Sequence, residues 1–262
     1  MAIAEFNTKV LNKTRPHGSL PGIYGEGVPL EEILDDLASQ IVGGQVLALR
    51  IADQPPYGIV LRVDQKELVE KVWKAKGRLT TSGEADLEKK PVTSLTSLQM
   101  KKLVDWNKLS SFGFDQSQVA EILDSGVHTV LPVTDNVAGH LVTPTPYGQS
   151  LSVMKFKECS PLSRLVTEVS KRDPRVILGG TSLNKDGEVA YLDSQKALDE
   201  MGGFTSVVDL FVLSRIRSDI NICEVSHAMF SLVDGGVKAI RGGIGYKQTI
   251  EKLEELRIKV LD

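Results

Sequence analysis

Helical and strand-like segments alternate along the first part of this chain, and this alternation most limits the fold. Apolar residues recur at helical spacing over Leu30–Ile41, and Gly43-Gly44 end that segment. Two β-type runs follow, Val46–Ile51 and Gly58–Val63, and a second amphipathic helix is predicted over Leu68–Trp73. Such a chain buries its apolar faces by packing helices on a sheet. The sequence therefore predicts an α/β fold.

The rest of the chain continues this pattern. Further helices are predicted around Ser97–Leu109, Ser117–Leu123, Leu162–Lys171 and Lys247–Val260. Further strands are predicted at Leu151–Phe156, Phe204–Val212 and a late hairpin, Ala228–Val233 and Val237–Ile240, while Thr80–Lys90 is expected to be a surface loop. Residues 1–28 lack sustained periodicity and are predicted to form an N-terminal arm, with 29–262 as a single domain.

Composition excludes several classes of protein. The formal net charge of −3 gives no global basic field for nucleic acid or acidic membrane, although 31 Lys and Arg leave a local basic groove open. Two cysteines without a Cys-x-x-Cys pair, and four scattered histidines, favour neither a disulfide framework nor a metal site. No apolar run approaches the roughly 18 residues that span a bilayer. We expect a soluble, cytoplasmic protein without a membrane partner.

A polar segment follows the apolar run Val176-Ile177-Leu178. Its sequence, Thr181-Ser182-Leu183-Asn184-Lys185-Asp186-Gly187, sets two hydroxyls and an amide close together. Small polar residues and glycine suit a backbone that approaches an anion or nucleotide closely. They equally suit an ordinary strand-to-helix loop, in which Ser and Asn satisfy the turn's own amides. Locally, both interpretations stay open.

Two cationic segments lie at the ends of predicted elements. Lys76-Gly77-Arg78 ends a helix, where the helix dipole alone favours cations, but the same residues could flank a phosphate. Arg241 ends a strand before Gly242-Gly243-Ile244-Gly245, which suits either a structural turn or an anion site. We find no Ser-His-Asp arrangement, Walker loop or dinucleotide fingerprint in its proper context.

Taken in order, these segments resemble the YrdC-type family, whose members make threonylcarbamoyl-adenylate for tRNA modification. The family's Ala-Lys-Gly-Arg-Pro is matched by Ala75-Lys76-Gly77-Arg78, and its Thr-Ser-Ala-Asn-x-Ser-Gly is close to Thr181–Gly187. Its Lys-Pro-Leu, Pro-Gly-Pro-x-Thr, Ser-Thr-Val-Val-Asp and Leu-Arg-x-Gly are similar, in turn, to Lys90–Val92, Val130–Thr134, Thr205–Asp209 and Ile240–Gly243. The likeness runs from Leu30 to Ile244.

The chain departs from the family on the amino-acid side of the expected pocket. The family has Pro-Thr-Asp-Thr before Tyr57, where this chain has Ala52-Asp53-Gln54-Pro55 and so lacks two hydroxyls. The arginine expected near position 155 is Lys155, which keeps the charge but loses the planar fork. The resemblance implies that Tyr57 and Lys155 line the substrate pocket.

The resemblance implies an α/β fold with a twisted mixed sheet, flanking helices and a large concave cavity. It implies a reaction that joins ATP, bicarbonate and L-threonine or a related amino acid into a carbamoyl-adenylate, with release of pyrophosphate. Magnesium is expected with ATP, and RNA or tRNA-modification proteins are the expected partners. The implied catalytic cations are Lys76, Arg78 and Arg241, and the implied nucleotide-binding residues are Thr181, Ser182, Asn184, Ser206 and Thr134.

Three hypotheses follow. The first is a divergent nucleotidyltransferase of this kind. The second is a relative that binds nucleotide or RNA without the full reaction, as the altered segment before Tyr57 suggests. The third is a structural or partner-binding α/β domain, which would have no affinity for nucleotides.

Overall fold

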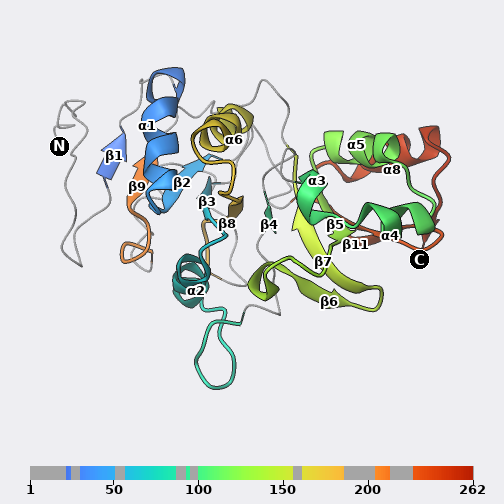
Figure 1. Cartoon of the computed structure of the whole chain (residues 1–262), viewed down its shortest axis with the longest axis horizontal. Helices are drawn as coiled ribbons and strands as arrows, with labels where there is room; N and C mark the ends of the chain where they lie inside the picture. The colour runs from blue at the N-terminus through green and yellow to red at the C-terminus, as the bar shows by residue number, and fades with distance from the viewer. Residues whose placement is uncertain are drawn as a thin grey trace.

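The computed structural model describes residues 22–24, 30–50, 57–86, 93–94, 100–155, 161–185, 204–212 and 227–261. Within these residues, twelve strands form one mixed sheet in the order β1-β9-β2-β3-β8-β4-β7-β5-β10-β11-β12, with β6 paired to β7 (Figure 1). The strands are β1 (Gly22–Tyr24), β2 (Leu47–Arg50), β3 (Tyr57–Arg62), β4 (Thr93–Ser94), β5 (His128–Pro132), β6 (Thr143–Thr145), β7 (Gly148–Val153), β8 (Leu178–Ser182), β9 (Leu210–Val212), β10 (Met229–Val233), β11 (Gly236–Arg241) and β12 (Val260–Leu261).

Helices pack on both faces of this sheet. They are α1 (Leu30–Val42), α2 (Lys66–Ala75), α3 (Met100–Leu103), α4 (Trp106–Ser111), α5 (Gln116–Asp124), α6 (Pro161–Arg172) and α8 (Tyr246–Glu255), with a short 3-10 helix, η1 (Gly139–Leu141). Figure 1 shows α1 beside α6 at one end of the molecule and α5 beside α8 at the other. The predicted fold class, a mixed sheet flanked by helices, is confirmed, whereas the concave cavity stays a prediction.

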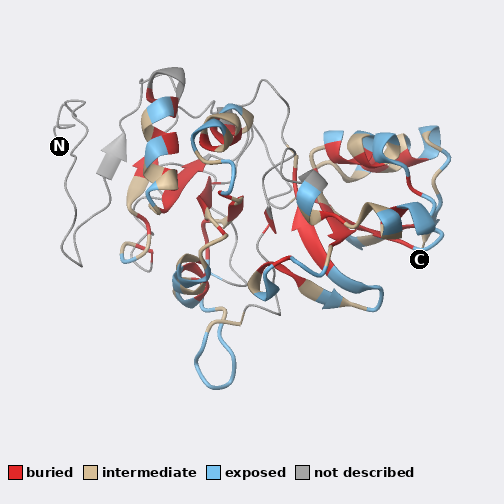
Figure 2. Cartoon of the chain, in the orientation of Figure 1, coloured by how far each residue is buried: buried red, intermediate tan, exposed pale blue. Residues whose placement is uncertain are grey.

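The two faces of the sheet carry separate apolar clusters. The cluster under α1 and α6 includes Leu47, Val60 and Leu178, and we call the face that bears them the first face. Side chains alternate along a strand, so Tyr57, Ile59 and Leu61 of β3 project from the opposite, second face. There they join Leu131 and Phe230 and the apolar sides of α2, α4, α5 and α8 in the larger cluster. Figure 2 accordingly shows buried strands beneath helices that are exposed on their outer sides.

Most of the predicted elements are present, with boundaries close to those expected. The helix predicted over Leu30–Ile41 is α1, the paired β runs are β2 and β3, and the late hairpin is β10 and β11. In the described part of the helix predicted around Ser97–Leu109 there are instead two short helices, because the Asp105 side chain accepts a hydrogen bond from the Lys108 N–H and starts α4. The C-terminal helix ends at Glu255, and β12 follows it.

Two predicted boundaries are wrong at the polar segments. Thr181 and Ser182 do not begin a turn but complete β8, because Ile59 and Gly58 of β3 pair with them. Conversely, Phe204 to Val207 form a turn, and only Leu210–Val212 of the predicted strand is β9. The Val207 and Val208 amides donate to the Phe204 carbonyl, which commits both amides to the turn.

The predicted division into an arm and a domain stays a prediction. Residues 22–24 of the predicted arm form β1, which pairs in parallel with β9. Most of 1–28, the segment Ala52–Pro55 and Lys90–Val92 lie outside the described residues. None of the helices in the described part of the chain is long and apolar enough to cross a bilayer.

Candidate functional site

A row of polar side chains crosses the first face of the sheet where the α1–α6 cluster ends. The strand register places one residue of each neighbouring strand opposite the next, from β8 through β4, β7 and β5 to β10. These residues are Gly180, Thr93, Ser152, Val130 and Ser231. Paired residues project from the same face, as do residues two apart on a strand. The row therefore continues to His128 on β5 and to Arg241 on β11, through Met229, which pairs with both.

We call Thr93, His128, Ser152, Ser231 and Arg241 the polar face. The apolar cluster under α1 and α6 contains residues of β2, β3 and β8, and Met154, but none of β5, β10 or β11. The helices at that end of the sheet instead pack on its second face. Among the described residues, the polar face is thus a stretch of sheet that the α1–α6 cluster does not cover.

Side-chain contacts show that the sheet bends around the polar face. Thr93 Oγ1 shares hydrogen bonds with His128 Nδ1 at 3.1 Å and with Ser152 Oγ at 3.3 Å. Strand β7 lies between β4 and β5, so their backbones would be about 10 Å apart in a flat sheet. Contact between Thr93 and His128 across that strand means that the sheet is concave here.

Two histidines on this face are held neutral. The rings of His128 and His227 meet edge to face, with their centroids 6.1 Å apart. Burial, together with the neighbouring His227 and Arg241, lowers the pKa of His128 to about 3. Burial, followed by the charge on Arg241, lowers the pKa of His227 to about 4. At neutral pH both imidazoles therefore offer one N–H donor and one acceptor.

Arg241 ends β11 beside these histidines. Its Nη2 and Nε donate to the His227 carbonyl oxygen at 2.9 and 3.3 Å, which fixes the guanidinium next to both rings. Partial burial lowers the pKa of Arg241 from its ordinary value. The predicted cation is thus present on the polar face, about five strand spacings of roughly 4.8 Å from β8.

A second group of the predicted residues gathers at the end of β8. The Lys76 ammonium donates to the carbonyl oxygens of Ser182 and Asn184, each at 2.5 Å, and the whole side chain is 1% exposed. It also lies 5.9 Å from the centre of the Phe204 ring. This contact brings the turn that contains Ser206 toward Lys76. We call Lys76, Ser182, Asn184 and Phe204 the lysine turn.

Two further predicted residues border the lysine turn. The Tyr57 carbonyl accepts from the Leu183 N–H at 2.9 Å, but the Tyr57 ring is fully buried and stacks on Phe211 at 5.3 Å. Arg78 lies over the Trp73 ring, 4.6 Å from its centre, and is half-buried. Arg78 is thus the more accessible cation of the pair that the sequence motif contains.

The remaining predicted residues lie elsewhere. Lys155 forms an ion pair with Asp124, the last residue of α5. Thr134 follows β5 and is tied through its N–H to the Leu103 carbonyl. The Thr181 side chain alternates to the second face, whereas Ser182 shares the first face with Gly180. Ser206 is exposed in the turn before β9.

Sequence reasoning missed Thr93, His128 and His227. The histidines are scattered in the sequence, without the spacing of a metal site, and Thr93 is 35 positions from the ring that it contacts. Only strand order brings these residues together. In the described residues, no group of three or more His, Cys, Asp or Glu could hold a metal ion.

Comparison with solved structures identifies the fold. No protein-family model and no curated protein matches the sequence. YciO from E. coli superposes with a TM-score of 0.59 at 14% identity, over 88% of this chain and 98% of that one. Sua5 from P. abyssi, complexed with L-threonine, gives 0.58 at 13% identity over 92% of this chain and 62% of that one.

The longer neighbours contain more than this chain. Full-length HypF, in a phosphate- and nucleotide-bound form, gives a TM-score of 0.56 at 17% identity over 81% of this chain. The chain spans only 29% of that HypF and 62% of Sua5. The structures nevertheless bear out, at the level of the fold, the resemblance that the motifs carry: this chain has the fold shared by YciO, Sua5 and part of HypF.

Proposed function

We propose that this chain binds ATP and an amino acid and joins them with bicarbonate into a carbamoyl-adenylate, with release of pyrophosphate. One observation carries the proposal. The two best-matched sequence motifs, separated by 106 positions, meet where the Lys76 ammonium donates to the carbonyls of Ser182 and Asn184. A buried ammonium with such partners fixes the backbone of this segment firmly. A rigid turn with nearby hydroxyls supports recognition of a nucleotide.

The proposed reaction needs positive charge around a developing anion. The amine of the amino acid adds to bicarbonate with loss of water and forms a carbamate. A carbamate oxygen then attacks the α-phosphorus, the bond from that phosphorus to the oxygen that bridges it to the β-phosphate breaks, and pyrophosphate leaves with that electron pair. Fixed cations stabilise such charge without reorganisation. Arg78 beside the lysine turn and Arg241 on the polar face are the accessible cations in this proposal, while Lys76 orders the turn.

The solved neighbours support the choice of ligands. The P. abyssi Sua5 structure is described as complexed with L-threonine, and the HypF structure as phosphate- and nucleotide-bound. Magnesium enters the proposal with the nucleotide phosphates, because the described residues contain no cluster of protein ligands for it. RNA or tRNA-modification proteins are the proposed partners.

A second candidate function, nucleotide or RNA binding without synthesis, is favoured by two observations on the amino-acid side. The Tyr57 ring is fully buried against Phe211, and Lys155 is paired with Asp124. Both predicted pocket residues are thus engaged within the protein.

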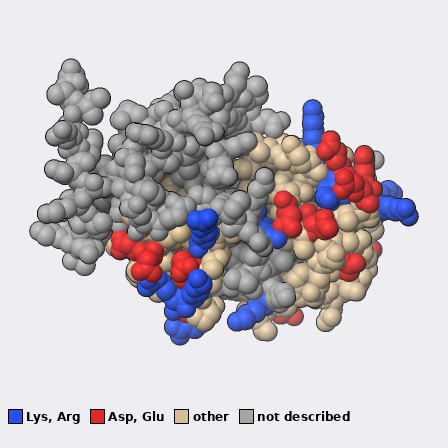
Figure 3. All heavy atoms as spheres, turned by 90° about the horizontal axis from the view of Figure 1, so that it is seen from above, with Lys and Arg blue, Asp and Glu red and all other residues tan. Residues whose placement is uncertain are grey.

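On the face in Figure 3, basic and acidic side chains are interspersed among the described residues, so this face favours a small ligand over a long RNA.

Calorimetric titration with ATP, combined with a pyrophosphate-release assay, separates these candidates. The synthase predicts ATP binding and pyrophosphate release that requires both L-threonine, or a related amino acid, and bicarbonate. ATP binding without amino-acid-dependent release would favour the second candidate. No ATP binding at all would leave a structural or partner-binding domain.

Arg78→Ala tests the role of the accessible cation. We expect nucleotide affinity to fall by about 1.5–3 kcal/mol, the usual loss for a charge-assisted hydrogen bond, or about 10- to 150-fold in Kd. Lys71→Ala is the matched control, because Lys71 is an exposed cation on α2, the helix that ends three residues before Arg78. Equal affinity of the Arg78 variant and the parent would mean that Arg78 takes no part in nucleotide binding.

A further inference from the structure

The polar face gathers basic groups without acidic ones. The strands β4, β7, β5, β10 and β11 contain Lys238 and Arg241 but no Asp or Glu. Among the described residues, no carboxylate lies within ion-pair distance of Arg241, whose guanidinium donates to the His227 carbonyl. Elsewhere in the described part of the chain, Arg62, Arg172 and Arg175 all pair with aspartates.

A guanidinium that has no carboxylate partner among the described residues favours an anion. Arg241 is exposed at the end of β11, where a ligand can reach it, and the protein around it lowers its pKa with no described carboxylate to offset that effect. The two imidazoles beside it each offer an N–H donor, and the buried hydroxyls of Thr93 and Ser152 hydrogen-bond to each other, and that of Thr93 to His128 Nδ1, which holds that ring in place. The guanidinium and the imidazoles together suit the several acceptor oxygens of a phosphate or sulfate.

We propose that Arg241, His128 and His227 form an oxyanion site whose occupation is coupled to proton uptake by the histidine pair. The ligand class is a tetrahedral dianion such as a phosphoryl group. If that phosphoryl group belongs to the bound nucleotide, the oxyanion site is part of the proposed nucleotide site, and to that extent this inference rests on the proposed function. The histidines add to the site a proton-linked control that Arg241 alone would not have.

The direction of the coupling follows from the charges around the rings. Among the described residues, the titratable groups that act on His128 are His227 and Arg241, Arg241 acts on His227, and Lys238 is the next cation along β11. The facing side chains of β4 and β7 are uncharged hydroxyls. A dianion beside the rings would offset Arg241 and raise both histidine pKa values. Binding should therefore take up protons and tighten as the pH falls.

Sulfate is the suitable probe, because it stays a dianion between pH 5.5 and 7.5, whereas inorganic phosphate does not. We would titrate the full chain with sulfate by calorimetry at both pH values, at constant ionic strength, in buffers of different ionisation enthalpy. The expected result is affinity about threefold or more tighter at pH 5.5, with net proton uptake. Equal affinity and no buffer dependence would overturn the proposal.

Three variants test which residues bind sulfate and which take up the protons. Thermal melting first has to show that each variant is folded. Arg241→Gln should weaken sulfate binding by about tenfold or more at both pH values. His128→Gln and His227→Gln, combined, should weaken sulfate binding less than Arg241→Gln does and should abolish proton uptake. Lys71→Gln, an exposed charge on α2, should change neither. Unchanged proton uptake in the double histidine variant would refute the role of the pair.

The same measurements separate this inference from the proposed function. Proton-linked sulfate binding without ATP binding would support the oxyanion site and contradict the nucleotide function. ATP binding without proton uptake would support the function and contradict the role of the histidine pair.

Discussion

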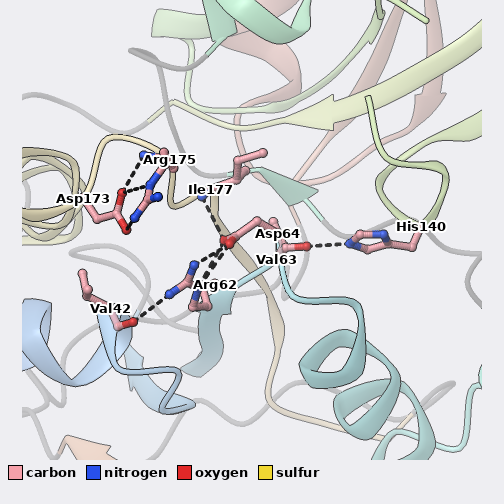
Figure 4. A network of polar contacts seen from close by, with 8 residues as sticks. All are labelled: Val42, Arg62, Val63, Asp64, His140, Asp173, Arg175 and Ile177. Carbon is pink, nitrogen blue, oxygen red and sulfur yellow. Dashed lines mark hydrogen bonds and ion pairs between the residues drawn. The ribbon is translucent and has the colours of Figure 1, made fainter. Parts of the chain in front are cut away.

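At the scale of single residues, one carboxylate ties three elements together. Asp64 Oδ2 accepts from Arg62 Nη2 at 2.6 Å, and its Oδ1 accepts from the Ile177 N–H at 3.2 Å (Figure 4). Arg62 Nη1 in turn donates to the carbonyl of Val42, the last residue of α1, at 2.7 Å. The end of α1, the end of β3 and the approach to β8 thus depend on one ion pair.

Asp64→Asn should destabilise the fold by about 2–4 kcal/mol, measured as the free energy of unfolding in urea. The substitution leaves the Arg62 charge, which is only 15% exposed, without its counter-charge, and breaking a partly buried pair is costly. Asp173→Asn is the control, because Asp173 pairs with the exposed Arg175 in the same view. A comparable loss in both variants would mean that the Asp64 contacts contribute no more than a surface pair.

At the scale of elements, the turn between β10 and β11 tests how β12 is attached. A Cβ on Gly236 would lie 2.4 Å from the Lys259 carbonyl oxygen, the acceptor of the Val237 N–H. Gly236→Ala should therefore separate β12 from β11. We expect a loss of about 1–3 kcal/mol and faster hydrogen exchange at the Val237 amide.

The neighbouring glycine provides the control for this element. Gly235 also has a positive φ, +78°, but a Cβ there would meet nothing within 4 Å. Gly235→Ala should cost only the backbone strain, about 1 kcal/mol, and leave the Val237 amide protected. Equal exchange at Val237 in the two variants would contradict the proposed clash.

The sequence predicts elements well where their own residues decide the structure. The amphipathic periodicity of α1, α2 and α6 and the apolar runs of β2 and β3 mark elements that bury a whole face. The strands β4 and β12 have only two residues each, and their partners decide their conformation. Phe204–Val207 has a β-type sequence but turns, because its amides bond to the Phe204 carbonyl.

The candidate site likewise contains some residues that sequence motifs predict and others that only the strand order brings together. The contact of Lys76 with Ser182 and Asn184 joins two motifs that the sequence contains in recognisable form. His128, His227 and Thr93 belong to no motif, and become neighbours through pairings between strands far apart in the chain. Contacts of this kind require the strand order, which local patterns do not specify.

At the scale of the whole molecule, two halves of the sheet meet at a short junction. In the described part of the chain, β4 pairs with β8 on one side and with β7 on the other through Thr93 and Ser94. Other contacts near this junction join His140 Nε2 to the Val63 carbonyl, at 2.7 Å, and His128 to Thr93. Protonation of His128 would therefore act where the halves of the sheet are joined.

Acid should destabilise the unliganded protein through His128 and His227. Their pKa values in the folded chain, about 3 and about 4, lie below 6.5, so the unfolded chain binds protons first as the pH falls. The contribution is fully present above about pH 6.5 and declines progressively toward pH 4, by on the order of a few kcal/mol. Urea unfolding at pH 7.5, 6.5, 5.5 and 4.5 measures this contribution.

The double His128→Gln and His227→Gln variant should have a flatter profile of unfolding free energy between pH 7 and 5, where few carboxylates titrate. Parallel profiles for variant and parent would show that neither imidazole is kept neutral by the fold.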